Sequence, residues 1–434
     1  MDGSIVGFLS LVAIVVLISF GIPVAISILS VTIVCMYLLL GDTFMLTTFE
    51  TLVWSSSSSY TFAVIPMFIL MGEISGATRI IGDLYKAGYR WLGGLRGGVY
   101  SSTVLASAGF AAISGSTVVN AAVFSRVALP EIERLGYHRG LGAGCIAASG
   151  TLAAMIPPSL TIVLYGILTS QSVGAMLMAG VVPGVLTALM LLMTVWTVVF
   201  ARPGLAPQAT EKFTWREKFG SLKAIWPVAL LAMIVLVGIY SGKVAPSAAG
   251  TVGAVGALLI TIANRRMTWD IFVASLKRTA VTSASLMFII IAGLLFSRML
   301  LFSGAVNDLS AFMSSSGFTP FTFMLCVVIG FFILGMFIDP ITMMVIAIPF
   351  LFPSVQKLGL DPIWFGIVIV KLVEIAAITP PIGINLFAVM SASDGRVSGR
   401  EIFVGVLPFV LAEFVVLGLI LSFPILSTFL PQTM

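Results

Sequence analysis

The chain has 434 residues, of which 59% are hydrophobic and only 9% are charged, and its mean hydropathy is +1.16. This composition excludes an ordinary soluble domain and predicts a polytopic membrane protein, because many apolar runs are long enough to cross a bilayer. The 22 Lys and Arg exceed the 17 Asp and Glu, but they form no basic stripe interleaved with aromatic residues, so nucleic acid is not an expected partner.

Apolar runs separated by polar residues, glycine or proline predict ten membrane spans. The first begins at Ser4 with no Lys or Arg before it, so we expect a retained span and not a secretory signal. Segments near 42–58 and 267–278 are expected to be interfacial helices. The predicted spans are 4–20, 22–40, 61–82, 141–168, 171–200, 224–241, 246–263, 280–302, 363–390 and 402–430.

Two further apolar segments carry a polar interruption halfway along. Residues 101–129 are interrupted by the Ser-Gly-Ser sequence that starts at Ser114, and residues 321–352 by the Asp-Pro pair that starts at Asp339. Each interruption predicts two half-helices that enter and leave the membrane on one side. Such a re-entrant hairpin is tolerated only where protein or a water-filled cavity covers its tip.

Each half of the chain also contains a proline pair inside an apolar span. The pairs that begin at Pro157 and Pro380 lie 223 positions apart, and Pro130 and Pro353 keep the same spacing. A proline pair removes two amide donors, so each helix is expected to unwind and leave carbonyl oxygens unpaired. Lipid cannot satisfy those oxygens, so paired broken spans in corresponding halves indicate the binding site of a transporter.

The basic loops assign the two hairpins to opposite sides of the membrane. Lys and Arg flank the first hairpin on both sides, whereas 303–320 before the second has neither and 353–362 after it has only Lys357. The repeat is therefore predicted to have inverted topology. The expected organisation is a first repeat at 1–201 (scaffold 1–82, transport elements 83–170, final span 171–201), a cytoplasmic linker at 202–223, and a second repeat at 224–434 (scaffold 224–302, transport elements 303–395, final span 402–430).

The interrupted segments concentrate hydroxyl and backbone oxygens in apolar surroundings. Carbonyls freed before each proline pair could complete two sodium sites, and the Asp339 carboxylate would be costly in hydrocarbon without a cation or a donor. One His and three scattered Cys cannot assemble a zinc-type cluster. We expect at least two sodium ions, bound by Ser114, Ser116, Ala153, Ile156, Pro158, Gly335, Asp339, Ala376, Thr379 and Pro381.

Other polar groups are candidates for an anionic substrate. Arg298 could hold a carboxylate bidentately, or it could extend to the membrane interface near the end of its span. Lys371 and Glu374 lie three positions apart, so they either neutralise each other or support the second cation. Clusters of small and hydroxyl residues can also be packing interfaces. The expected substrate-binding residues are Gly115, Thr117, Asn120, Ser159, Arg298, Thr342, Gly383 and Asn385.

A set of motifs spread over nearly the whole chain occurs together in one transporter family. The motifs are Gly21-Ile22-Pro23, residues 65–72, residues 93–98, Ser114-Gly115-Ser116, Leu129-Pro130 with Gly136-Tyr137, Ile156-Pro157-Pro158-Ser159, Pro183-Gly184 and residues 379–383. In combination they resemble the large membrane subunit of tripartite ATP-independent periplasmic (TRAP) transporters. The family often has glycine where Ala153 stands.

The resemblance implies an all-α fold of the ion-transporter superfamily and sodium-driven uptake of an organic acid anion, such as a C4-dicarboxylate, sialic acid or a related sugar or keto acid. It implies an elevator, in which hairpins and broken spans form a transport domain that moves against a scaffold. The implied partners are a small four-helix membrane subunit, expected as a separate chain, and a periplasmic substrate-binding protein, in the lipid of the bacterial inner membrane.

Three alternatives remain at this stage. A stand-alone sodium/carboxylate symporter shares the architecture but needs no binding protein. An ion channel is disfavoured because duplicated, inverted broken helices favour alternating access. A membrane enzyme is disfavoured because no catalytic triad, metal motif or nucleotide loop is visible in the sequence.

Overall fold

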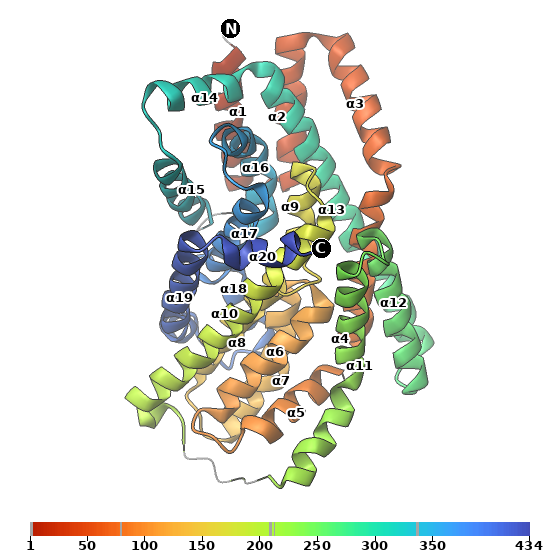
Figure 1. Ribbon diagram of the computed structural model, residues 1–434, viewed down its shortest axis with the longest axis vertical. Helices are drawn as coiled ribbons and strands as arrows, with labels where there is room; N and C mark the ends of the chain where they lie inside the picture. The colour runs from red at the N-terminus through yellow and green to blue at the C-terminus, as the bar shows by residue number, and fades with distance from the viewer. Residues whose placement is uncertain (1–2, 79, 208–210, 212, 336–337) are drawn as a thin grey trace.

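The computed structural model describes the chain except for residues 1–2, 79, 208–210, 212 and 336–337 (Figure 1). Within the described residues the regular structure is helical, with no β-strand. The helices are α1 (Gly3–Ser19), α2 (Val24–Leu40), α3 (Asp42–Ser57), η1 (Tyr60–Ala63), α4 (Val64–Ala77), α5 (Ile80–Leu92), α6 (Gly98–Ser114), α7 (Thr117–Arg134), α8 (Arg139–Met155), α9 (Leu160–Thr169), α10 (Val173–Ala201), η2 (Pro203–Leu205), α11 (Trp215–Tyr240), α12 (Pro246–Ala263), α13 (Trp269–Ser303), α14 (Ala305–Ser315), α15 (Pro320–Gly335), α16 (Pro340–Lys357), α17 (Pro362–Ile378), α18 (Ile384–Ala392), α19 (Gly399–Ser422) and α20 (Ile425–Gln432).

Several helices have the length and composition of membrane spans. Among the described residues, α10, α13, α16 and α19 could each cross a membrane, and the number rises to seven if each of three bent helix pairs counts as one span. Shorter apolar helices, among them α1, α2, α6 and α15, accompany them. The predicted class, an all-helical polytopic membrane protein, is confirmed. The number of ten crossings stays a prediction.

Some predicted element boundaries were wrong. The interfacial helix expected at 267–278 and the span expected at 280–302 form one continuous 35-residue helix, α13. The sequence from Trp269 to Ser303 contains no proline, so nothing forces a break between the two parts. At the other end, the span expected at 402–430 stops at Ser422, because Pro424 follows and the chain turns into α20.

The two halves carry matching helices in matching register. Helices α7 and α16 each have 18 residues and begin 223 positions apart, and α8 and α17 each have 17 residues with the same offset. Both proline pairs contain a cis peptide bond. In Figure 1 the pair α6 and α7 lies in the lower half of the molecule, whereas α15 and α16 lie in the upper half. The repeat detected in the sequence therefore extends to the helix boundaries.

The two broken spans lie at the centre of the helix packing. Every residue from Gly140 to Met155 of α8, and from Trp364 to Ile378 of α17, is buried. Helix α8 packs against α6, α7, α10, α17, α18 and α19. Its small residues permit close approach: a Cβ atom at Gly144 would lie 2.3 Å from the carbonyl carbon of Gly405. Neighbouring helices therefore enclose the helices that carry the breaks.

Ion pairs connect the first half of the chain to the second, and two of them involve α4 and α5. The Asp83 carboxylate of α5 lies 2.5 Å from the Arg266 guanidinium, and Glu73 of α4 lies 2.6 Å from Arg278 of α13. All four side chains are at least partly accessible. Exposed ion pairs of this kind contribute little to stability, about 0–1 kcal/mol.

Candidate functional site

The first hairpin turns over a tight three-residue tip, residues 114–116 (the first tip). Helix α6 ends at Ser114, and Gly115 adopts a left-handed backbone with φ of 62°. Ser116 is extended and caps α7, with its hydroxyl accepting a hydrogen bond from the Val119 amide at 3.5 Å. A left-handed residue between two helices favours glycine, so the Ser-Gly-Ser sequence itself produces the turn.

The first broken span loses its helical hydrogen bonds at residues 156–159 (the first break). Helix α8 ends at Met155, and Ile156 is extended. Pro157 and Pro158 carry no amide hydrogen, so the carbonyls of Ala153 and Ala154 lose the donors that a continuous helix would supply. Backbone oxygens are therefore freed at the end of a fully buried helix.

Ser159 replaces one of the lost donors. Its hydroxyl donates to the carbonyl of Ala154 and accepts from the amide of Ile162 at 3.3 Å, which caps α9. The carbonyl of Ala153 has no such replacement among the contacts of the described residues. That oxygen is available for a cation or for a donor on a ligand.

The first tip lies directly against the first break. The Leu160 amide donates to the Gly115 carbonyl at 3.4 Å, and a Cβ atom at Gly115 would lie 2.8 Å from the Pro158 carbonyl oxygen. Ser114 is buried, and its hydroxyl has no hydrogen-bond partner among the described residues. The structure thus brings the candidate residues of the first tip and the first break together, with one buried polar group free to bind a ligand.

In the second half, α15 ends at Gly335 and α16 is capped by Asp339; these two residues mark the second tip, and residues 336–337 lie outside the described part. The Asp339 carboxylate caps α16 and accepts from the amides of Ile341 and Thr342 at 3.1 and 3.2 Å. The hydroxyl of Thr342 also donates to it. Asp339 stands 223 positions after Ser116, which caps α7, so both tips present a helix N-terminus with an oxygen-bearing cap.

The second broken span is interrupted at residues 379–383 (the second break). Helix α17 ends at Ile378, and Thr379 is extended, with its hydroxyl donating to the Ile375 carbonyl at 2.6 Å. Pro380 and Pro381 again lack amide hydrogens, and Pro381 is exposed. The Thr379 carbonyl already accepts from the Gly383 amide at 3.1 Å.

The second tip contacts the second broken span, just as the first tip contacts the first broken span. A Cβ atom at Gly335 would lie 2.3 Å from the Cβ atom of Ala376, one turn before the second break. In the first half the tip contacts the break itself, whereas this contact lies slightly upstream. Both halves nevertheless seat the turn of a hairpin on the end of a broken, buried helix.

Two of the candidate substrate residues are occupied by contacts between helices. Asn120 is fully buried and holds α7 to α6, with its Oδ1 accepting from Ser107 Oγ at 2.9 Å and its Nδ2 donating to the Ser107 carbonyl at 3.3 Å. Asn385 Nδ2 donates to the Ala147 carbonyl at 3.3 Å, and its buried Oδ1 has no partner among the described residues. Thr117 is half-buried at the start of α7.

Arg298 differs from the buried candidate residues in its exposure. Its side chain is exposed on α13. The structure therefore places this guanidinium on an outer face of its helix.

The donor set favours an alkali cation over a transition metal. No group of three or more His, Cys, Asp and Glu that could hold a metal occurs among the described residues. Both tips and both breaks offer carbonyl and hydroxyl oxygens, together with the single carboxylate of Asp339. Neutral oxygens with few charges are the ligands that transporters use for sodium, and the unpaired hydroxyl of Ser114 fits such a role.

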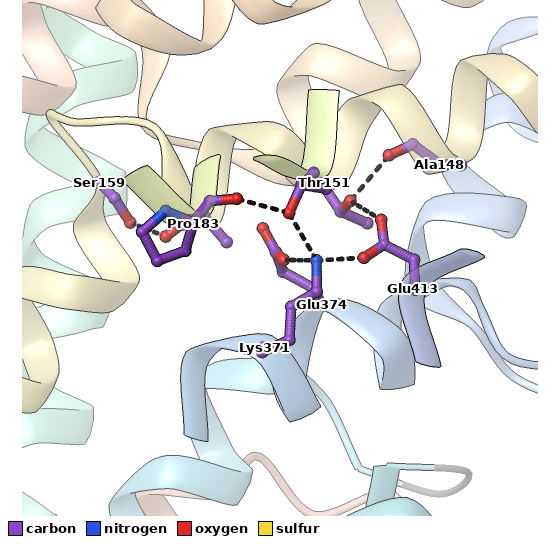
Figure 2. A network of polar contacts seen from close by, with 9 residues as sticks. Ala148, Thr151, Ser159, Pro183, Lys371, Glu374 and Glu413 are labelled. Atoms are coloured by element: carbon purple, nitrogen blue, oxygen red, sulfur yellow. Dashed lines mark hydrogen bonds and ion pairs between the residues drawn. The ribbon is translucent and has the colours of Figure 1, made fainter. Parts of the chain in front are cut away.

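A buried ionic cluster links the centres of the two halves (Figure 2). Lys371 Nζ lies 2.9 Å from Glu374 Oε2 and also pairs with Glu413 Oε2, and all three side chains are fully buried. Lys371 donates to Thr187 Oγ1 at 2.9 Å, and Glu413 Oε1 faces Thr151 Oγ1 at 3.4 Å. The sequence pattern indicates a pair of Lys371 and Glu374, but Glu413 was not expected in it, although a carboxylate inside an apolar run is by itself a signal.

Comparisons with known proteins agree on one family. Residues 11–426 match the model described as "Tripartite ATP-independent periplasmic transporter, DctM component". The chain is 35% identical to the C4-dicarboxylate TRAP transporter large permease protein DctM of Pseudomonas aeruginosa, over 87% of this chain and 88% of that protein. It is 27% identical to the sialic acid TRAP transporter large permease protein SiaM of Vibrio cholerae, over 100% and 98%. Among solved structures, the YdaH transporter of Alcanivorax borkumensis has a similar fold, with a TM-score of 0.57 at 14% identity over 88% of this chain and 89% of that chain.

Proposed function

Because the chain belongs to the family of tripartite ATP-independent periplasmic transporter DctM components, we propose that it is the large permease of a sodium-coupled uptake system for an organic acid anion. We propose that it lies in the bacterial inner membrane. The family membership supports secondary transport, and the geometry of the tips and breaks supports sodium as the coupling ion.

One observation carries the proposal. In each half of the chain, a hairpin tip is seated on a buried helix that a proline pair interrupts, and the two arrangements lie 223 positions apart. Discontinuous helices in corresponding halves of a transporter bring unpaired carbonyls and helix N-termini to one region. An enzyme, or a proline kink with only a structural role, would not require this arrangement of tip and broken helix to occur twice.

The proposed sodium sites are the junctions of tip and break. The first uses the freed carbonyl of Ala153 and the unpaired hydroxyl of Ser114, and the second uses the Asp339 carboxylate. Bound sodium would hold each tip to its break and so complete the surface between them. The full proposed set is Ser114, Ser116, Ala153, Ile156 and Pro158 at the first site, and Gly335, Asp339, Ala376, Thr379 and Pro381 at the second.

The proposed substrate is a carboxylate bound near the helix N-termini at these junctions. The N-termini of α7 and α9 lie close together, since Ser116 caps one, Ser159 caps the other, and Gly115 contacts Leu160. Helix N-termini attract anions. The named relatives act on C4-dicarboxylate and sialic acid, both of which carry carboxylates, and this shared group is the one we propose for recognition.

The proposed cycle is an elevator. The hairpins and the broken spans pack against one another and would move together as the transport domain. Helices α1–α4 and α11–α13 would form the scaffold. A small membrane subunit would brace that scaffold, and a periplasmic binding protein would deliver the substrate. Sodium and substrate would each raise the other's affinity by the same factor, because binding linkage is reciprocal.

Reconstitution tests the proposal. The chain and its cognate small subunit are placed in liposomes, and uptake of dicarboxylates and sialic acid is measured under an inward sodium gradient, with and without the periplasmic binding protein. We expect uptake that needs both the gradient and the binding protein. Uptake with the gradient alone would identify a stand-alone symporter, and uptake that ignores sodium would refute the proposed coupling.

A further inference from the structure

The start of α11 differs in direction and in composition from the rest of that helix. Helix α11 bends by 53° between the segment Trp215–Lys223 (the surface segment) and the apolar part Ile225–Tyr240. The surface segment contains four charged residues, whereas the apolar part contains none. Charged residues are costly in hydrocarbon, so the surface segment lies at the face of the bilayer that the apolar part is expected to cross.

The surface segment exposes one apolar face. Trp215, Phe219 and Leu222 follow the i, i+4, i+7 spacing of a single helical face, and they are 68%, 59% and 39% exposed. Trp226, just past the bend, is 48% exposed. Tryptophan, phenylalanine and leucine on one face of a charged helix are typical of a segment that lies in the boundary between lipid headgroups and acyl chains.

Basic side chains border this apolar face on both edges. An α-helix advances about 100° per residue, so Arg216 and Lys223 fall at one edge of the face and Lys218 falls at the other. Lys218 Nζ lies 5.1 Å from the centre of the Trp215 ring. Lysine and arginine in such positions attract the anionic headgroups of a membrane surface.

The acidic groups of the surface segment and of α5, which packs on α11, are engaged elsewhere. Glu217 accepts from the amide and the hydroxyl of the residue that caps α11, both at 2.8 Å, and Asp83 is in the ion pair described above. Helix α5 adds two exposed basic side chains, Lys86 and Arg90. Residues 202–223 as a whole contain five Lys and Arg against two Glu. The charge of this surface therefore complements an anion.

Trp91 fixes the surface segment to α5. Its Nε1 donates to the Lys218 carbonyl at 3.1 Å, and its ring meets the rings of Trp215 and Phe219 edge-on, with centroids 6.4 and 5.6 Å apart. Helix α5 packs in turn on α6, the first helix of the first hairpin. In Figure 1, α11 begins at the lower edge of the molecule. A ligand on the surface segment would thus act on α11 directly and on the first hairpin through α5.

We propose that the surface segment is a binding site for an anionic phospholipid of the cytoplasmic leaflet. The acyl chains cover the apolar face, and the phosphate lies at its basic edges. The site holds α11 and α5 together at the membrane surface. It rests on the cytoplasmic location predicted for 202–223 and is independent of the proposed sodium sites.

Quenching of tryptophan fluorescence by brominated lipids tests the site. The full chain is prepared with Trp215 as its only tryptophan, the other six being changed to phenylalanine, and is placed in bilayers with equal mole fractions of brominated phosphatidylglycerol or brominated phosphatidylcholine. We expect both lipids to quench Trp215, with an affinity about fivefold higher for the anionic lipid. Arg216→Gln combined with Lys223→Gln should bring this ratio close to one, whereas Lys277→Gln on α13 should not change it.

Trp54 provides the matched control. It is 75% exposed on α3, a helix with no Lys or Arg. A chain with Trp54 as its only tryptophan should be quenched by both lipids to the same degree. If a single-tryptophan chain fails to fold, Trp215→Phe and Trp54→Phe in the otherwise unchanged protein decide the same question, since only Trp215→Phe should remove the quenching that is specific to the anionic lipid.

Four results would overturn the proposal. They are the absence of quenching at Trp215, equal quenching of Trp215 by the two lipids, and a preference for the anionic lipid that survives the double substitution of Arg216 and Lys223. The fourth is quenching that disappears when the cognate small subunit is added, which would identify the apolar face as a protein interface. The measurement needs neither sodium nor substrate, so its failure is distinguishable from a failure of the proposed transport.

Discussion

A Cβ atom at Gly115 would lie 2.8 Å from the carbonyl oxygen of Pro158, so the first tip and the first break are in direct contact. Real Cβ atoms do not approach backbone so closely, and the left-handed φ of 62° further disfavours any other residue. The identity of residue 115 therefore controls the spacing of the first proposed sodium site.

Gly115→Ala should weaken sodium dependence of uptake. The strained backbone costs about 1–2 kcal/mol, and relief of the contact moves the tip away from the break. We expect the sodium concentration for half-maximal uptake to rise about tenfold. The control is Gly109→Ala on the same hairpin helix, where a Cβ would meet only the end of the Leu84 side chain at 3.3 Å. Equal effects of the two substitutions would contradict a specific role for the tip.

Asp339→Asn should raise the sodium requirement without unfolding the protein. A charge-assisted contact is worth about 1.5–3 kcal/mol, which corresponds to a factor of ten or more in affinity. The chain offers a matched control in Asp361, which also precedes a proline and caps a helix through two amides, those of Ile363 and Trp364. Asp361→Asn should change stability to a similar degree and leave the sodium dependence of uptake unaltered. Unchanged sodium dependence in Asp339→Asn would remove Asp339 from the site.

Ser159→Ala should destabilise the first break. The substitution removes the cap of α9 and the donor to the Ala154 carbonyl, so we expect a loss of about 1–3 kcal/mol in the free energy of unfolding. Thermal unfolding in detergent measures it. Ser172→Ala is the comparison, because Ser172 caps α10 from an exposed position and has no second bond of this kind. A smaller loss at Ser159 than at Ser172 would show that the hydroxyl does not stabilise the break.

Cross-linking tests the proposed movement. Asp83 and Arg266 would belong to the transport domain and the scaffold, respectively, whereas Glu133 lies in the predicted transport elements and Arg396, 2.7 Å away, directly follows them. Each pair is replaced by cysteines, after the free Cys35, Cys145 and Cys326 are changed to alanine.

A short bifunctional thiol reagent should stop uptake when it joins positions 83 and 266. It should leave uptake largely intact when it joins 133 and 396. Uptake that continues with the first pair cross-linked would contradict an elevator with these domain boundaries.

The breaks were predictable from the sequence because the effect of proline on a helix is local. The pairs at Pro157 and Pro380 remove amide donors whatever surrounds them, and α8 and α17 each end two positions before the first proline of the pair. The Ser-Gly-Ser tip was predictable for the same reason, since a left-handed residue between helices favours glycine.

Features that depend on packing were not predictable in this way. The continuity of α13 lacks a local signal, because an interfacial helix and a span differ only in what covers them. Glu413 is distant in sequence from Lys371, and only the packing of α19 on α17 brings them together. The exposure of Arg298 likewise depends on which face of α13 its neighbours cover.

The most direct test of the account is the number of sodium ions that the purified chain binds at equilibrium, measured with radioactive sodium. We expect at least two ions per chain, with Asp339→Asn removing one and Asp361→Asn removing none. A chain that binds no sodium, or that binds equally well after Asp339→Asn and Gly115→Ala, would contradict the assignment of the sodium sites to the junctions of tip and break.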